Sequence, residues 1–130
     1  MVRIFTSRIL ENTLSNDERD ALISDFKRYK ETGELPDTFG RDEHYDHPYT
    51  LSAVQSEELR HLHINENGWP LNVVQWGRTS DTHLVYCQGF IDSESYALLT
   101  YLSPDAHNQA RNNDIMLNLA KSAGRFRDEH

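Results

Sequence analysis

Hydrophobic residues recur along the chain with two periods, which predict a strand and a helix in the first 33 residues. Residues 2–9 alternate between apolar and polar positions and predict a first strand. The next segment has the period of an amphipathic helix, with apolar positions at Leu22, Ile23, Phe26 and Tyr29. Ser15 and Glu18 form a capping box that predicts its start, and Gly33 suits its end.

The middle of the chain combines a polar segment with strand-like runs. Residues 35–49 contain two prolines and three aspartates, and we interpret them as an ordered loop, followed by a possible short helix at 53–58. Strands are predicted at residues 59–64, 73–78, 82–90 and 96–102. Because residues 79–81 are turn formers, we expect the second and third of these strands to pair as a hairpin.

Helical patterns return near the C-terminus. Ser103 and Pro104 predict a helix start, with serine as the N-cap and proline in the first turn. Asn112 and its neighbours are expected to interrupt that helix and to cap a second one. The second helix has an apolar stripe at Ile115, Leu119, Ala123 and Phe126.

This order of elements predicts an α+β fold in a single domain spanning residues 1–130. We expect an antiparallel sheet of about four strands, with N-terminal helices packed on one face and a helix at the C-terminus. The other face of the sheet is then expected to remain free for binding.

Composition and charge limit the expected location of the protein and the part of the chain that can bind RNA. No apolar run approaches the ~20 residues needed to span a bilayer, the N-terminal segment lacks the apolar core of a signal peptide, and the only cysteine is Cys87. We therefore expect a cytoplasmic protein without a membrane partner. The net charge is −8, whereas nucleic-acid binders usually carry excess Lys and Arg. Residues 74–127 carry five basic and five acidic side chains, so any RNA contact is expected in this half.

Four separated blocks of sequence resemble one family in order and almost without gaps. They are Leu35-Pro36-Asp37-Thr38-Phe39-Gly40-Arg41-Asp42 with Tyr45-Asp46, His61-Leu62-His63-Ile64-Asn65-Glu66-Asn67, Arg78-Thr79-Ser80-Asp81 with His83-Leu84-Val85-Tyr86-Cys87-Gln88-Gly89, and Pro104, His107, Ala110, Arg111 and Asn113. The family is that of the YafO-type toxins of type II toxin–antitoxin systems. More distantly, the second half resembles RelE-like toxins.

The resemblance implies a RelE-like strand–helix–helix–sheet fold and a toxin that inhibits protein synthesis. It implies a metal-independent endoribonuclease that cleaves messenger RNA in the ribosomal decoding site, using the 2′-hydroxyl of the RNA to attack the adjacent phosphate. The implied partners are the ribosome with its messenger RNA and a cognate antitoxin protein, and no cofactor is implied. Better-known RelE-like nucleases carry several cations on the strand before the hairpin turn, whereas residues 73–78 contain only Arg78. That basic cluster therefore does not carry over.

Histidine suits this chemistry because its pKa allows it to act as base or acid near neutral pH. His83 is the first catalytic candidate, since the expected hairpin would place it opposite Arg78, whose charge would favour a neutral imidazole. His107 is the second candidate, and helix spacing places Arg111 on the same face as a possible phosphate contact. The alternatives are a cross-strand polar pair on the surface and an exposed helical histidine.

Three further residues are candidate RNA contacts. Trp76 is expected on the face of Arg78 and His83, where it would stack on a base, although an aromatic residue on a strand more often packs beneath a helix. Lys121 and Arg125 follow the last helix and either contact RNA or form a solvated face.

Two other functions remain open. His61 and His63 share one face of a strand, but zinc motifs such as HExxH are missing, so we expect no metal, and a metal-dependent hydrolase is a minor alternative. A non-catalytic toxin of RelE or ParE fold, which binds and inhibits a protein target, is the other.

Overall fold

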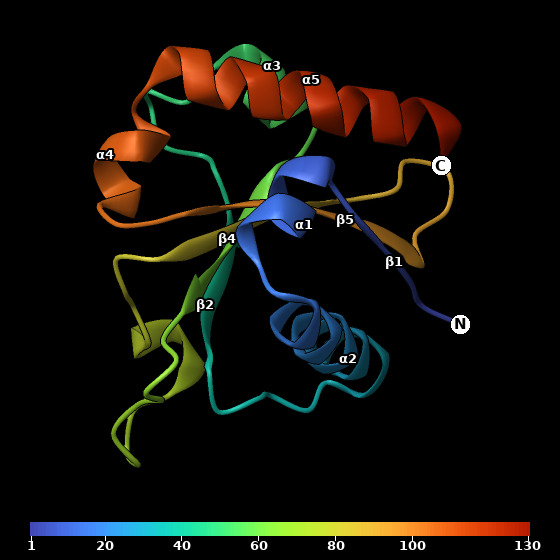
Figure 1. Ribbon diagram of the computed structural model, residues 1–130. Coiled ribbons are helices and arrows are strands. Elements are labelled where there is room, and N and C mark those ends of the chain that lie inside the picture. Colours follow the sequence, from blue (N-terminus) through green and yellow to red (C-terminus); the bar gives the residue numbers. More distant parts are fainter.

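A five-stranded sheet lies between two layers of helices in the computed structural model, which describes all 130 residues (Figure 1). In chain order the elements are β1 (Arg3–Thr6), α1 (Arg8–Thr13), α2 (Asn16–Thr32), β2 (Phe39–His44), α3 (Ser52–Ser56), β3 (Arg60–Ile64), the 3₁₀ turn η1 (Gln75–Gly77), β4 (His83–Gln88), β5 (Ser95–Leu102), α4 (Ala106–Ala110) and α5 (Asn113–Glu129).

The strand order is β1-β5-β4-β3-β2, with β1 parallel to β5 and the other neighbours antiparallel. The predicted α+β class is confirmed, with five strands in place of about four. The additional strand is β2, which lies in the segment predicted to be a loop. It is an edge strand with a register shift between Phe39 and Asp42 and a polar sequence, so it lacks the apolar alternation by which strands are recognised.

The predicted hairpin between residues 73–78 and 82–90 is wrong. Gln75–Gly77 form a 3₁₀ turn, and β4 pairs instead with β3, with His83 opposite His63. Val74 and Trp76 are 74% and 60% exposed, so the apolar residues that suggested a strand do not pack into the core.

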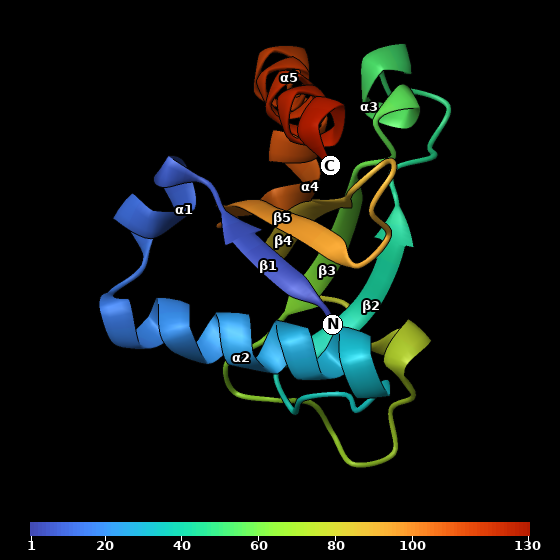
Figure 2. The same ribbon diagram turned by 90° about the vertical axis from the view of Figure 1, so that its right-hand side faces the viewer.

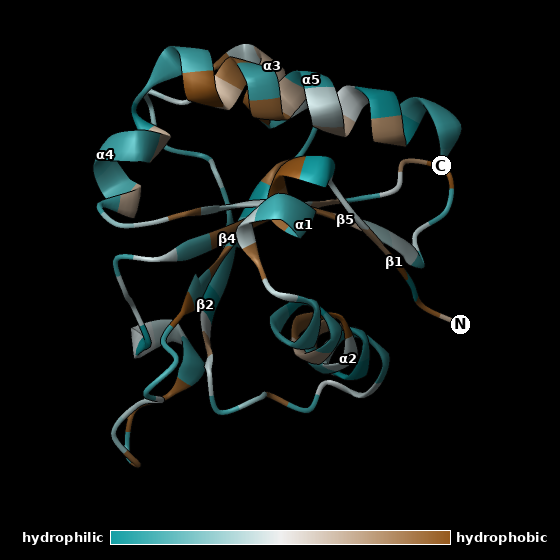
Figure 3. Cartoon of the chain, viewed as in Figure 1, coloured by the Kyte–Doolittle hydropathy of each residue, from teal (hydrophilic) through white to brown (hydrophobic).

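Helices cover both faces of the sheet, so the expected free face is also wrong (Figure 2). On the side of α1 and α2 the buried core consists of Leu10, Leu22, Phe26, Phe39, Leu62, Ile64, Leu84, Tyr86 and Leu98. On the side of α3, α4 and α5 it consists of Val54, Leu59, Val85, Cys87, Ala97, Leu99, Leu102, Ala106, Met116, Leu119, Ala120 and Ala123. Figure 3 shows α2 and α5 alternating hydrophobic and hydrophilic segments along the ribbon, as helices packed on one side do.

Capping residues set several of the helix ends. Ser15 and Glu18 form the predicted capping box of α2, Gly33 ends that helix with φ 77°, and Asn112 caps α5. The first strand ends earlier than predicted because Ser7 caps α1. No helix combines the length and the apolar character needed to cross a membrane.

The predicted helix start at Ser103-Pro104 is displaced by two residues. Asp105 has φ 62°, so regular helix begins only at Ala106. The cap comes from a distant residue: the Asp81 carboxylate accepts hydrogen bonds from the backbone N–H groups of Asp105 and Ala106, at 2.6 and 3.0 Å.

Candidate active site

Four imidazoles meet where β3, β4 and α4 come together. His61 and His63 are two residues apart on β3 and therefore point to the same face of the sheet. His83, at the start of β4, is the cross-strand partner of His63, and their ring centroids are 4.2 Å apart. The His83 ring lies 4.9 Å from that of His61 and 5.4 Å from that of His107 on α4. We call these four residues the histidine cluster.

The three histidines on the sheet are buried, whereas the histidine on α4 is exposed. His63 and His83 are each 2% exposed and His61 is 8% exposed. His107 is exposed, so it is the member of the cluster that solvent or a ligand reaches first. His61 and His63 are buried because α4 and α5 cover this face of the sheet.

Burial keeps the inner imidazoles neutral. Burial, followed by the effect of neighbouring His63, lowers the pKa of both His61 and His83 to about 3. Burial likewise lowers the pKa of His63, although its hydrogen bond with the Ser80 backbone acts in the opposite direction. Near pH 7 the three inner rings are thus uncharged, as expected for His83. The cause is burial and not Arg78.

The edge strand β2 and the residue after it complete the site. The Glu43 carboxylate lies 3.3 Å from Nε2 of His61, and the Tyr45 ring stacks on the His61 ring with centroids 4.2 Å apart. Arg41 lies close enough for its charge to contribute to the lowered pKa of His63. Sequence reasoning missed all three residues because it assigned this segment to a loop. Arg41, Glu43 and Tyr45 alternate with other residues along this segment, and this period of two was the signal that could have indicated a strand.

Unpaired polar atoms concentrate in the same place. Six buried side-chain nitrogen or oxygen atoms lack a hydrogen-bond partner in the molecule, and four of them belong to His61, His83 and Tyr45. They are Nδ1 of His61, both ring nitrogens of His83 and the Tyr45 hydroxyl. Buried polar atoms are normally paired, so these four atoms are available to water or a ligand.

The structure brings two of the predicted site residues together, His83 and His107. Arg78 does not oppose His83, since its guanidinium donates hydrogen bonds to the backbone carbonyls of Val73 and Phe39. The predicted phosphate contact of Arg78 therefore lacks the geometry on which it was based. Arg111 is exposed at the C-terminal end of α4, one turn beyond His107.

Trp76 is not buried beneath a helix. It is 60% exposed in η1, and the Arg41 guanidinium lies over its ring, 4.2 Å from the centroid. Arg41 also donates a hydrogen bond to the Trp76 carbonyl. The exposed Trp76 ring thus lies against a partly buried cation of β2, the same edge strand that supplies Glu43.

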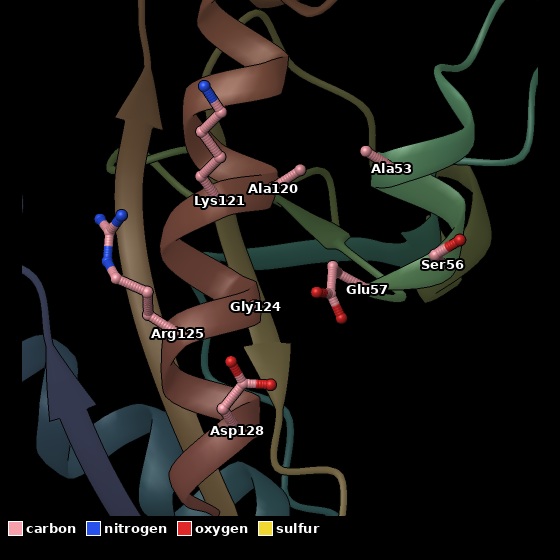
Figure 4. A pocket seen from close by; sticks show the side chains of 8 residues that line it. All are labelled: Ala53, Ser56, Glu57, Ala120, Lys121, Gly124, Arg125 and Asp128. Atoms are coloured by element: carbon pink, nitrogen blue, oxygen red, sulfur yellow. The ribbon is translucent and has the colours of Figure 1, made fainter.

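Lys121 and Arg125 lie away from the cluster. They are eight and twelve residues along α5 from Asn113, or roughly 12 and 18 Å along its axis. Both line a shallow groove between α3 and α5, shown in Figure 4, where their side chains extend from the side of α5 away from α3. Arg127, in contrast, is 7% exposed and donates hydrogen bonds to Glu58 and to the Ser56 carbonyl, so it holds α5 against the end of α3.

The opposite face of β2 carries a separate polar network. Asp42 accepts hydrogen bonds from the hydroxyls of Tyr29 and Tyr86, at 2.8 and 2.7 Å, and is paired with Lys30 and Arg60. Burial raises the pKa of the Asp42 carboxyl, but these cations and hydroxyls together outweigh burial and lower it. Every member has a partner within the network, so this network joins α2 to the sheet.

Comparisons with known proteins agree with the resemblance in the sequence. A family model described as "Toxin YafO, type II toxin-antitoxin system" matches residues 27–128, a range that includes the whole histidine cluster. The mRNA interferase toxin YafO of Escherichia coli (strain K12) is 41% identical over 129 residues, which cover 97% of this chain and 98% of that protein. No solved structure matches the chain. The chain belongs to the YafO toxin family of type II toxin–antitoxin systems.

Proposed function

We propose that this toxin is an endoribonuclease that cleaves messenger RNA on the ribosome and thereby stops protein synthesis. Its relative is named an mRNA interferase, and nearly the full lengths of the two chains align. The observation that carries the proposal is the position of His107, an exposed imidazole next to three buried, neutral imidazoles.

The proposed reaction is attack of an RNA 2′-hydroxyl on the adjacent phosphorus. The bond from phosphorus to the 2′-oxygen forms, and the bond to the 5′-oxygen of the next nucleotide breaks. One group must take the 2′ proton and another must protonate the leaving oxygen. His107 is exposed and takes one of these two roles at the RNA, and water at the open side of the cluster takes the other. His83 lies behind His107, with ring centroids 5.4 Å apart, and backs it with a neutral imidazole. This chemistry requires no metal.

Cations near the cluster suit the phosphate. Arg111 is exposed one helical turn from His107. Arg41 lies at the β2 side of the cluster, and its stacking partner Trp76 leaves an exposed ring on which a base can stack. Lys121 and Arg125 are too far along α5 to reach the same phosphate, so we assign them to contacts with more distant RNA.

The net negative charge of the chain favours an RNA substrate that is presented by the ribosome. A net charge of −8 provides little general attraction for free RNA, whose binding depends on phosphate contacts. The ribosome holds messenger RNA in place and removes that requirement. A cognate antitoxin is the second proposed partner. The order β1, α1, α2 followed by the strands β2 to β5, with the short α3 and η1 between them, supports a RelE-like fold.

The test uses antitoxin-free toxin, one defined messenger RNA and primer extension, with and without translating ribosomes. The proposal predicts cuts only with ribosomes. Toxin pre-treated with EDTA, whose metal-free state is verified before it is added to magnesium-containing ribosomes, should cut equally well. Arrested translation without any cut would favour a non-catalytic toxin that binds a protein target.

A further inference from the structure

We propose that Glu43, His61 and His63 form a binding site for a divalent transition metal ion of the zinc class. One ligand atom from each residue lies within 4.8 Å of the other two. The site goes beyond the proposed function, which needs no metal, and it can be tested without RNA.

The separation of the ligand atoms suits a tetrahedral ion. Zinc binds histidine nitrogen and carboxylate oxygen at about 2.0–2.2 Å, so tetrahedral ligands lie roughly 3.3–3.6 Å from one another. The Glu43 oxygen and Nε2 of His61 are already 3.3 Å apart. Since all three atoms lie within 4.8 Å, small side-chain rotations bring His63 to the same distance.

The donor set selects the class of ion. Two imidazoles and one carboxylate suit zinc and its neighbours in the first transition series. Magnesium and calcium prefer six or more oxygen ligands, which this site does not offer. The remaining coordination position faces His83 and His107, where water or a further imidazole can complete the shell.

The tautomer of His63 decides whether its Nε2 can bind an ion. Nδ1 of His63 accepts a hydrogen bond from the Ser80 backbone N–H at 2.8 Å and also lies 3.1 Å from the Ser80 carbonyl. When Nδ1 carries the proton, it donates to the carbonyl and leaves Nε2 free to bind an ion, an arrangement common among zinc-binding histidines. In the other tautomer Nδ1 accepts from the Ser80 amide and Nε2 carries the proton. Metal binding therefore selects the first tautomer.

His83 is the candidate for a fourth ligand. Both of its ring nitrogens are buried without a partner, and its ring lies 4.9 Å from that of His61. An ion that His83 also binds would give one of these nitrogens a partner, since buried polar atoms are normally paired. Strands hold side chains in fixed positions, which suits metal ligands, and β2 and β3 supply all three ligands.

The test measures zinc affinity by competition with a chromophoric zinc indicator, using the full chain after chelator treatment. We expect one zinc ion per chain, retained in the presence of millimolar Mg²⁺. Glu43→Gln and His61→Gln should each weaken zinc binding at least about tenfold. His47→Gln should leave the affinity unchanged, because His47 lies outside the cluster and its ring packs at a tilt against that of Tyr49.

Glu43 is partly exposed on an edge strand, so its variant is expected to fold, which circular dichroism verifies. Failure of the wild-type chain to compete with the indicator would overturn the metal site, and so would equal affinity of the wild type and Glu43→Gln. Neither result depends on RNA cleavage. Failure of the cleavage assay, in turn, would overturn the proposed function and leave the zinc measurement standing.

Discussion

The carboxylate of Asp81 accepts a hydrogen bond from the backbone N–H of Ala106, at 3.0 Å, and the next residue is His107. The same carboxylate binds the N–H of Asp105. Asp81 lies two residues before His83, so a single side chain joins the start of β4 to the start of α4. This link fixes the position of His107 relative to His83.

Asp81→Ala should therefore misplace His107. We expect cleavage to fall about tenfold to a hundredfold, because displacements near 1 Å have such effects on catalytic groups. Loss of the cap should cost about 0.5–2 kcal/mol in the free energy of unfolding. Asp81→Asn, which keeps one acceptor oxygen, should retain more activity. Cleavage rates and denaturant melts test this, and equal rates for the Ala and wild-type proteins would exclude a positioning role.

Arg41 should contribute mainly to the rate of cleavage, and Arg78 mainly to the stability of the fold. Arg41→Gln should slow cleavage and cost about 0.5–1.5 kcal/mol in stability, since it removes one hydrogen bond, to the Trp76 carbonyl, from a partly buried side chain. Arg78→Gln should instead lower the free energy of unfolding by about 1–3 kcal/mol, because it leaves the Val73 and Phe39 carbonyls without their donor. Paired melts and cleavage assays measure both. The reverse pattern would return Arg78 to the phosphate site.

Stability of metal-free protein should fall as the pH is lowered from 7 to 5. The folded-state pKa of His61 and His83 is about 3, against an ordinary value of 6.5. In this range the unfolded chain binds more protons than the folded one, so acid favours unfolding. We expect a loss of at least about 1.4 kcal/mol, the equivalent of one pKa unit. Denaturant melts at each pH measure it, and His83→Gln should show a shallower decline.

Zinc and chelator should act in opposite directions on cleavage. If an ion occupies Glu43, His61 and His63, it withdraws two imidazoles of the cluster and adds two positive charges beside His107. Cleavage should therefore slow in micromolar zinc and recover fully after EDTA treatment. The measurement is the initial rate on ribosome-bound messenger RNA, with Glu43→Gln as a zinc-insensitive comparison. Loss of activity in EDTA-treated toxin would make the ion a cofactor instead.

Local signals predicted the parts of the fold that depend on neighbouring residues. The capping box at Ser15, the stop at Gly33 and the cap at Asn112 all lie within a few residues of the helix ends that they set. The segment containing Arg41 and Glu43 was missed because an irregular edge strand with polar residues on both faces has no apolar alternation.

Long-range pairing explains the errors around the candidate site. The turn-like residues 79–81 suggested a hairpin, whereas β4 pairs with β3 across a loop of 18 residues from Asn65 to Thr82. That pairing brings His63 opposite His83 and removes Arg78 from it. Likewise, the cap of α4 comes from Asp81, more than 20 residues earlier, a distance at which no local motif operates.

The most direct test of the account compares His107→Gln with His47→Gln in the ribosome-dependent cleavage assay. His107 is exposed, so its replacement should leave the melting curve unchanged while cleavage falls about 10²–10⁴-fold, the range for a positioned acid or base. His47→Gln should cleave like the wild type. Cleavage by His107→Gln at the wild-type rate would contradict the central claim that this exposed imidazole acts on the RNA.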